Sequence, residues 1–156
     1  MEFRKAKKSD EKGIAHVLMK SYNINSLKEG IDAFRAEMKK GHNFVVAVEN
    51  GKIIGIASWV SHGLPKHQLA ELDRIAVLPE YRGKGVSDKL FRFLLEDVKN
   101  FYISKKSKLR KFFVLTHADN KRAQEFYKRV GFRFEAKLKD HYYKDKDEYV
   151  MSMFFR

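Results

Sequence analysis

The chain alternates between segments with the pattern of β-strands and segments with the spacing of α-helices, and no other feature restricts the fold as much. Residues 44–48 and 53–57 are rich in β-branched side chains and flank Asn50-Gly51, the strongest short-range signal of a hairpin turn. Further strands are predicted at residues 2–7, 69–77, 112–115, 132–138 and 148–155. The early hairpin and the late strand pair predict a sheet with antiparallel neighbours.

Four segments between these strands have the spacing of helices: residues 9–22, 26–41, 86–98 and 120–130. Ser9 is suited to the N-cap of the first helix, and Ser26-Leu27-Lys28-Glu29 forms a capping box that opens the second. Gly41 and Gly131 are the expected stops of the second and fourth helices. Strands interleaved with helices predict a mixed α/β sheet that is covered by helices.

The length and composition are those of one globular domain. The chain has 156 residues, of which 44% are hydrophobic and 34% charged, and it therefore has enough apolar side chains for a sizeable core. Pro65 and Pro79 are the only prolines, and no Gly- or Ser-rich stretch marks a linker. We therefore expect residues 1–156 to form a single domain.

The chain is strongly basic and contains no cysteine. Its 33 Lys and Arg residues against 20 Asp and Glu residues give a formal net charge of +13, which favours phosphate-bearing or other anionic partners. The absence of Cys excludes disulfides, thiolate metal sites and mechanisms that carry an acyl group on a protein sulfur. No apolar run approaches the roughly 18 residues of a membrane helix, and residues 1–5 lack the apolar stretch of a signal peptide. We expect a cytoplasmic protein with no membrane partner.

Residues 72–87 combine a strand, a short glycine-containing loop and the start of a helix. Gly83 and Gly85 leave backbone N–H groups of the loop accessible, because no Cβ blocks a ligand there. The helix dipole favours an anion at this end, and Arg82 and Lys84 add positive charge. The segment lacks the glycine spacing of a Rossmann fingerprint or a Walker loop. It predicts a phosphate-binding loop, with a purely structural strand-to-helix turn as the alternative.

Two segments resemble the cofactor motifs of the GNAT superfamily of N-acetyltransferases. Arg82-x-x-Gly85-x-Ser87 is similar to the acetyl-CoA pyrophosphate loop, in which Ser87 departs from the usual Gly or Ala. Residues 120–132 match every named position of the second segment, Asn-x-x-Ala-x-x-(Phe or Leu)-Tyr-x-x-x-Gly-Phe. Taken alone, Asn120 would be a helix N-cap and Tyr127 a core aromatic. The resemblance implies the GNAT α/β fold, a mixed and strongly twisted sheet of about seven strands with helices on both faces.

The same resemblance implies that acetyl-CoA is the co-substrate and that no metal takes part. The cofactor-binding residues that it carries over are Ile75, Ala76, Val77, Arg82, Gly83, Lys84, Gly85, Val86, Ser87, Asn120, Ala123, Phe126 and Tyr127. In the family, the backbone of residues 75–77 holds the pantetheine arm, and Tyr127 matches the tyrosine that protonates the departing CoA thiolate. Because the chain lacks Cys, direct transfer in a ternary complex is the remaining route.

An acceptor amine must lose its proton before it attacks the thioester, since a lysine amine has a pKa near ~10.4. Glu71 stands where the histone-acetylating members of the family carry their general-base glutamate. Strand alternation predicts that Glu71 and Asp73 share one face with Ile75 and Val77. The alternatives are that Glu71 is a strand-edge carboxylate paired with a basic side chain, or that a water relay is the base. In the family, a backbone amide near Val77 meets the charge that develops on the thioester oxygen.

The acceptor is expected to be a protein or peptide amine, with a small amine such as an amino acid, polyamine or aminoglycoside as the alternative. The hairpin segment His141-Tyr142-Tyr143, with Asp147 and Val150-Met151 after it, resembles the tyrosine-bearing hairpin of protein N-terminal acetyltransferases. The positive net charge disfavours a polycationic acceptor unless acidic side chains converge at the site. The candidates for such an acidic mouth are Glu71, Asp73, Asp140, Asp145 and Asp147. A non-catalytic acyl-CoA- or RNA-binding module of the same fold is a further hypothesis.

Two other segments carry weaker signals. His62 and His67 flank a short loop that is expected to be solvated, because no Cys or carboxylate beside them suggests a metal site. Lys105–Lys111 is strongly basic and is expected to be a solvated loop between a helix and a strand. Because this run contains no aromatic residue, contact with nucleic acid ranks below that interpretation. A homodimer is among the assemblies that we consider.

Overall fold

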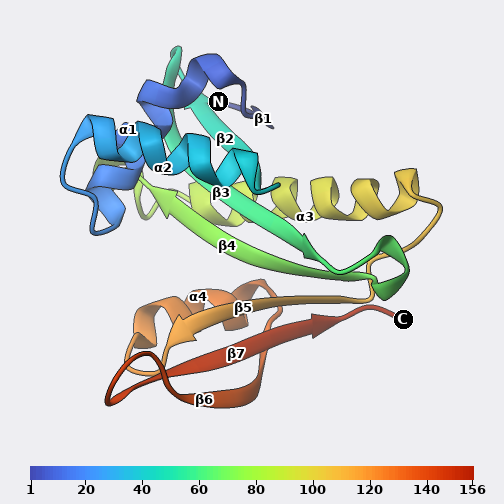
Figure 1. The fold of residues 1–156 in the computed structure, drawn as a ribbon. Coiled ribbons are helices and arrows are strands. Elements are labelled where there is room, and N and C mark those ends of the chain that lie inside the picture. Colours follow the sequence, from blue (N-terminus) through green and yellow to red (C-terminus); the bar gives the residue numbers. More distant parts are fainter.

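Seven strands form one mixed sheet in the order β1-β2-β3-β4-β5-β7-β6, and the computed structural model describes residues 1–156 (Figure 1). The strands are β1 (Glu2–Lys5), β2 (Asn43–Glu49), β3 (Lys52–His62), β4 (Leu69–Val77), β5 (Lys111–His117), β6 (Arg133–Tyr143) and β7 (Lys146–Phe154). The helices are α1 (Glu11–Ser21), α2 (Leu27–Lys39), α3 (Val86–Ser104) and α4 (Lys121–Val130). Only β4 and β5 are parallel neighbours.

The predicted hairpin of β2 and β3 is confirmed. Asn50 and Gly51 connect the two strands with φ values of +50° and +77°, the left-handed backbone that a tight hairpin turn of this kind requires. β3 continues beyond the predicted segment to His62, and β4 has the predicted bounds. The last two strands are longer than predicted, because they pair with each other out to Tyr143 and Lys146 at the tip of their hairpin.

Local capping was predicted correctly for α2 and wrongly for α1. The Ser26 hydroxyl accepts from the Glu29 N–H at 3.0 Å, as the capping box requires. Ser9, the predicted N-cap of the first helix, lies instead inside a short 3₁₀ turn, and α1 begins at Glu11. The reason is Asp10, whose carboxylate accepts from the Lys7 N–H at 2.7 Å and so fixes the chain before the helix.

Helices cover both faces of the sheet, as predicted. On one face α2 meets β4, where Arg74 donates to Glu37 at 2.9 Å; on the other face Trp59 of β3 donates to Asp97 of α3 at 3.0 Å. The predicted apolar stripe of α3 is buried at Val86, Leu90, Leu94 and Val98. Burial of these side chains and of the aromatic residues around them supplies most of the driving force for folding. None of the helices combines the length and the apolar character that crossing a membrane requires.

β4 and β5 pair over only four residues and then separate. Their parallel ladder runs from Leu69 opposite Lys111 to Leu72 opposite Val114, and no pairing continues beyond it. The two strands diverge toward their carboxyl ends, with β4 on the side of α1 and β5 on the side of β7 (Figure 1). Residues 73–77 of β4 therefore present a backbone edge that no strand covers.

β4 also contains a bulge that the alternation of residues does not predict. The register against β3 shifts by one residue at Asp73, which has no partner there. Asp73 and Arg74 both lie on the α2 side, whereas Ile75 and Val77 lie on the α3 side. The prediction that Glu71 and Asp73 share a face with Ile75 and Val77 is therefore wrong, because a bulge reverses the alternation that follows it.

Candidate active site

The loop between β4 and α3 is a cradle of free backbone donors. Gly83 and Gly85 have φ values of +76° and +79°, which glycine adopts without the strain of other residues. The backbone N–H groups of residues 83–88 have no acceptor within the protein. They include the first turn of α3, where the helix dipole favours an anion. A cavity of about 290 Å³ lies at this loop and is lined by Tyr81, Arg82, Gly83, Gly85, Val86, Ser87, Asp88 and Arg129.

The surroundings of this cradle fit the pyrophosphate of coenzyme A. A Cβ added at Gly83 or Gly85 would meet no atom within 4 Å, so the space in front of both glycines is open. The one carboxylate that lines the cavity belongs to Asp88, and Arg129 of α4 pairs with it at 2.8 Å. This pairing lowers the pKa of Asp88, chiefly through the hydrogen bond from Arg129. The cavity is thus positively charged and rich in donors.

The open edge of β4 is bonded by two side chains from elsewhere. The Tyr22 hydroxyl accepts from the Ile75 N–H at 3.2 Å and lies 3.3 Å from the Ile75 carbonyl, to which it donates. Arg82 Nε donates to the Val77 carbonyl at 2.9 Å. These contacts satisfy the backbone N–H and C=O groups in the part of β4 where the pantetheine arm is expected. Tyr22 follows α1 and has no motif around it, so nothing in the sequence predicted its contact with β4.

Arg74 holds Tyr22 in place. Its guanidinium lies 4.6 Å from the centre of the Tyr22 ring and donates two hydrogen bonds of 2.9 Å to Glu37 of α2. The pKa of Tyr22 is raised, chiefly by burial. The segment after α1 is therefore fixed against the diverging edge of β4 by stacking and by an ion pair.

Residues 120–130 of the second predicted motif form the N-cap and the body of α4, whose Tyr127 is a neighbour of Tyr22. The Asn120 side chain accepts from the Ala123 N–H at 3.1 Å, so it acts as the helix N-cap, and its amide group has no other partner. Phe126 packs edge-on against Tyr127 in the aromatic cluster around Phe132. The Tyr127 hydroxyl has no hydrogen-bond partner within the protein. Burial raises the pKa of Tyr127 far above its usual value, and the neighbouring Tyr22 adds to this effect.

Glu71 lies on the face of β4 that points away from α3, and it is paired with a histidine. His62 Nε2 is 2.8 Å from Glu71 Oε1, and the His62 ring stacks 5.4 Å from Phe113 of β5. The Glu71 side chain is only 17% exposed, and burial raises its pKa, while the hydrogen bond with His62 opposes that shift. His62 was expected in a solvated loop and instead ends β3 next to the proposed base.

A second histidine–carboxylate pair was missed by the sequence analysis. His117 ends β5 and forms a short hydrogen bond with Glu148, its neighbour across the ladder on β7. Glu148 is 3% exposed, and a buried carboxylate requires such a partner. In β5, alternation places His117 on the face of Phe113, which carries the His62 and Glu71 side chains. The sequence signal was weak: a histidine that ends an apolar strand, and one of two adjacent acids at the start of another strand.

Acidic side chains do converge beside the diverging strands, but they are only partly the predicted ones. Glu71 and Asp73 lie on the face of the sheet away from α3, and Glu148 shares this face through its pairing with His117. Burial raises the pKa of Tyr142, and the charges of Glu71, Glu148 and Asp73 raise it further. The other three candidates belong to the β6–β7 hairpin. The Asp140 carboxylate accepts from the Asp145 N–H, and the Asp147 carboxylate accepts from the Asp140 N–H and pairs with Lys137. Asp145 contributes only its own N–H to these bonds. The acidic mouth thus comprises Glu71, Asp73 and Glu148.

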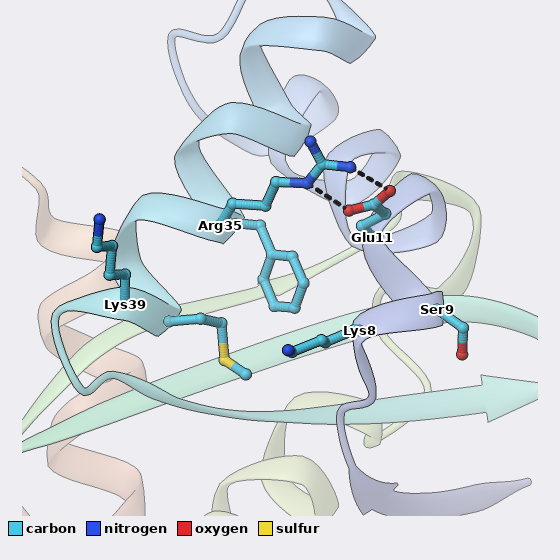
Figure 2. A pocket seen from close by; sticks show the side chains of 7 residues that line it. Lys8, Ser9, Glu11, Arg35 and Lys39 are labelled. Atoms are coloured by element: carbon cyan, nitrogen blue, oxygen red, sulfur yellow. Dashed lines mark hydrogen bonds and ion pairs between the residues drawn. The ribbon is translucent and has the colours of Figure 1, made fainter.

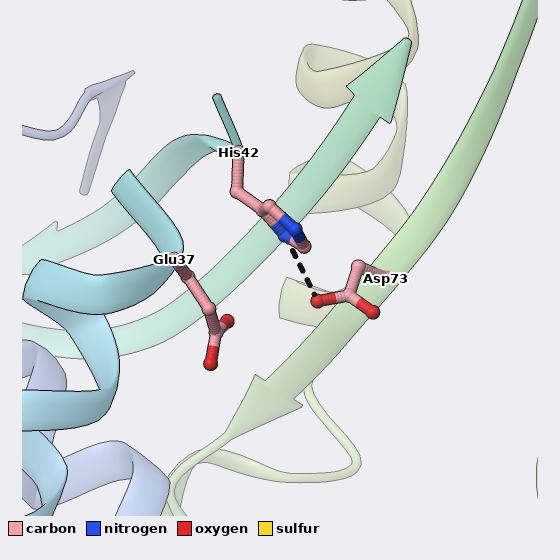
Figure 3. Close-up of side chains that lie close together, drawn as sticks. All are labelled: Glu37, His42 and Asp73. Atoms are coloured by element: carbon pink, nitrogen blue, oxygen red, sulfur yellow. Dashed lines mark ion pairs between the residues drawn. The ribbon is translucent and has the colours of Figure 1, made fainter. Parts of the chain in front are cut away.

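His42 lies next to this mouth, in a cluster with Glu37 and Asp73 (Figure 3). His42 Nδ1 is 3.2 Å from Asp73 Oδ2, whereas both Glu37 oxygens are occupied by Arg74. A cation at this point would find two ligand atoms and a guanidinium beside them. The cluster is therefore better described as an ion-pair network than as a metal site.

A separate cavity lies between α2 and the start of α1. It has a volume of about 720 Å³ and is lined by Lys8, Ser9, Glu11, Phe34, Arg35, Met38 and Lys39 (Figure 2). Arg35 spans part of it and pairs with Glu11 at 2.8 Å. None of the predicted catalytic or cofactor-binding residues lines this cavity, which is a shallow hollow between α2 and the start of α1.

Comparison with known proteins identifies the family of the chain. The sequence profile of the family described as Acetyltransferase (GNAT) domain matches residues 40–134. A protein of Methanocaldococcus jannaschii described as an uncharacterized N-acetyltransferase is 34% identical over 104 residues, which are 64% of this chain and 43% of that protein. The match thus spans less than half the length of that relative.

Solved structures share the fold over almost the whole chain. A GNAT-family acetyltransferase of Desulfovibrio desulfuricans has a TM-score of 0.80 and 22% identity, and the match covers 98% of each chain. An aminoglycoside 6'-N-acetyltransferase complexed with coenzyme A has a TM-score of 0.80 and 14% identity over 99% of this chain and 97% of that one. Since the family profile covers more than half of the residues, the chain belongs to the GNAT family of acetyltransferase domains.

Proposed function

We propose that the protein transfers the acetyl group of acetyl-CoA directly to a primary amine. The observation that carries this proposal is the arrangement along the diverging edge of β4. A donor-rich loop follows β4, Tyr127 is a neighbour of Tyr22, which bonds the edge at Ile75, and histidine-paired carboxylates lie on β4 and on β7. The two histidine-paired carboxylates, Glu71 and Glu148, are only 17% and 3% exposed, and a carboxylate withdrawn from water costs stability, which favours a functional role for them.

Acetyl-CoA supplies an activated thioester when it is bound. The N–H groups of residues 83–88, together with Arg82 and Lys84, hold its pyrophosphate. The backbone of Ile75 to Val77 holds the pantetheine arm, so Tyr22 and Arg82 give up their bonds to this edge when the arm binds. Ala123 and Phe126 of α4 line the other side of the arm, and Asn120 donates from its free amide group.

Glu71 accepts the proton of the acceptor amine, directly or through His62, which it contacts at 2.8 Å. Its raised pKa makes it a stronger base than an exposed glutamate. A backbone N–H near Val77 meets the negative charge on the thioester oxygen. Tyr127, which keeps its proton at neutral pH, donates that proton to the sulfur as the C–S bond breaks. The acetyl group ends on the amine nitrogen, and the released thiol carries the tyrosine proton.

His117 is a second candidate for the base. It lies on the same face as Glu71, and Glu148 fixes its ring through the Nδ1 atom. The Nε2 atom of His117 has no protein partner and is therefore free to accept a proton. The His62–Glu71 pair lies on β3 and β4, whereas the His117–Glu148 pair lies on β5 and β7. This difference makes them separable by mutation.

The acceptor that we favour is a protein or peptide amine. Tyr142 and Tyr143 project from the β6–β7 hairpin next to the acidic mouth, and both are exposed. Such a hairpin offers aromatic and hydrogen-bonding contacts to an extended backbone. The acidic mouth is also a specific reason to keep a small cationic amine as the second candidate, since three carboxylates attract a second positive charge. An aminoglycoside is the acceptor of one solved protein of this fold.

Titration calorimetry with acetyl-CoA, followed by a CoA-release assay, tests the proposal. Peptides with free N-termini, lysine peptides and small polyamines form the acceptor panel. Binding together with release on one class of acceptor supports the proposal and selects between the two candidates. Binding without release on any amine would instead indicate a non-catalytic acyl-CoA-binding module, and the absence of binding would contradict the assignment of the loop.

A further inference from the structure

The basic run of the sequence gathers at the end of the molecule that is remote from the phosphate loop. Residues 99–111 contain six Lys and Arg side chains and no acid. α3 begins at the phosphate loop and ends at this run, and its 19 residues separate the two ends by about 28 Å. Figure 1 shows the C-terminal end of α3, the start of β5 and the end of β7 together at this side. The run is thus independent of the acetyl-transfer site.

The run is not a loose loop, because hydrogen bonds fix it to the turn before β4. The Ser107 hydroxyl donates to the Pro65 carbonyl at 3.1 Å, and Arg110 donates from its guanidinium to the His67 carbonyl at 3.0 Å. The backbone N–H groups of Arg110 and Lys111 both donate to the Gln68 carbonyl. A fixed backbone keeps the positions from which the basic side chains extend in one arrangement. This lowers the conformational entropy that is lost when a ligand binds.

A groove of about 340 Å³ lies within this basic surface. Its walls carry Lys99 of α3 and Lys108 and Arg110 of the loop, together with Arg156, and no Asp or Glu side chain lines it. Its apolar part is formed by Ile103, which is 63% exposed, and by Leu109 and Phe155. The groove therefore combines cations with an apolar surface that water contacts.

The fold also brings an aromatic ring from another segment to this groove. Phe155, which follows β7, lines the groove, and the Lys99 ammonium lies 5.1 Å from the centre of its ring. Phe154 and Lys111 do not line the groove, and Lys111 is paired with Glu135 at 2.8 Å. Cations beside an aromatic ring are a combination that binds single-stranded nucleic acid.

We propose that this basic groove binds a single strand of nucleic acid. Lys99, Lys108 and Arg110 contact backbone phosphates, and an unstacked base packs against Ile103 and Phe155. A duplex fits less well, because its base faces are covered and leave the apolar part of the groove without a partner. An acidic peptide would use the cations and leave the aromatic ring unused. This site is separate from the proposed acetyl transfer and does not depend on it.

Fluorescence anisotropy with a labelled single-stranded uridine 12-mer, measured over a series of salt concentrations, tests the proposal. The variant K99Q/K108Q/R110Q removes three charges from the groove. We expect its Kd to rise about tenfold or more at 0.1 M salt, and the slope of log K against log salt to fall by about 2 units, roughly 0.7 for each phosphate that the variant no longer neutralises. The single variant K108E, at an exposed residue without a partner, gives a second measurement that does not disturb the loop.

The matched control K8Q/K12Q/K39Q removes three exposed lysines near the other cavity. We expect it to change the Kd by less than about twofold, since charges beyond a Debye length of ~10 Å are screened at this salt concentration. Equal weakening in both triple variants would assign binding to the diffuse net charge and overturn the proposal, as would no binding to the single strand. A duplex or a glutamate 12-mer that binds more tightly than the single strand would assign the surface to a different partner.

Discussion

The Tyr22 hydroxyl is bonded to both polar backbone groups of Ile75, 3.2 Å from the nitrogen and 3.3 Å from the oxygen. A strand edge that no neighbour covers must satisfy its N–H and C=O groups in some other way. In this protein a tyrosine from the segment after α1 does so, at the place where the proposed pantetheine arm binds. The Tyr22 hydroxyl and the proposed pantetheine arm therefore compete for the backbone groups of Ile75.

Tyr22→Phe is expected to strengthen acetyl-CoA binding while it lowers the stability of the free protein. The cofactor no longer displaces a hydroxyl, and a net hydrogen bond of about 1 kcal/mol corresponds to roughly fivefold in Kd. Calorimetry measures the affinity and thermal unfolding the stability. Tyr102→Phe is the control, since its hydroxyl bonds the Leu69 carbonyl at 2.7 Å near the other end of α3 and should lower stability alone. Weaker acetyl-CoA binding in Tyr22→Phe would show that this hydroxyl contacts the cofactor instead.

Tyr127→Phe is expected to lower kcat by about 100-fold, the usual contribution of a general acid, with little change in the Kd of acetyl-CoA. The ring and its packing against Phe126 and Phe132 are retained, so the fold should be unaffected. Steady-state CoA release measures kcat, and calorimetry measures the Kd of acetyl-CoA. An unchanged kcat would rule out the acid role.

Gly85→Val is expected to weaken acetyl-CoA binding by more than about tenfold, because the new side chain enters the open space that the pyrophosphate needs and strains a φ of +79°. Gly41→Val is the matched control. Gly41 has a φ of +93° and equally open surroundings, and it follows α2 away from the loop. Both variants should lose stability, but only the first should lose affinity. Equal affinities would contradict the assignment of the phosphate loop.

The pH dependence of kcat/KM distinguishes the two candidate bases. A base acts only when deprotonated, so activity should fall as the pH drops through the pKa of Glu71, which burial raises. Glu71→Gln should remove this acid limb and lower kcat/KM by about 100-fold. Glu125→Gln, at an exposed residue of α4, should leave the profile unchanged. If His117→Gln and not Glu71→Gln removes the limb, the His117–Glu148 pair is the base.

Asp10→Ala is expected to lower the free energy of unfolding by about 2 kcal/mol at pH 7, since Asp10 accepts charge-assisted hydrogen bonds from Arg4 at 2.8 and 2.9 Å. The hydrogen bond from Arg4 lowers the pKa of Asp10. Its stabilisation is therefore complete above the unfolded value near ~3.9 and is lost as the pH falls through the lower folded value. Urea unfolding at pH 7 and at acid pH measures this change. Asp32→Ala, which breaks an exposed pair with Lys28, should cost less than about 0.5 kcal/mol at either pH.

Periodicity and turn chemistry determined most of the fold. The Asn50-Gly51 turn, the β4 segment and the stripe of Val86, Leu90, Leu94 and Val98 depend on neighbours within a few residues, and all were predicted. The prediction of Ser9 as the N-cap of the first helix was wrong, because Asp10 accepts from the Lys7 N–H and from the side chain of Arg4 in β1. A local rule fails where a contact from another element competes with it.

The sequence by itself determined the elements and the glycine loop between β4 and α3, because hydrophobic spacing and glycine conformation are local properties. Tertiary structure alone decided the acceptor side. The bulge at Asp73 turned Ile75 and Val77 away from Glu71, and the pairing of β5 with β7 brought His117 to Glu148. Strand register and the divergence of β4 from β5 come from contacts between residues far apart in the chain. The residue types at these positions do not reveal the register by themselves.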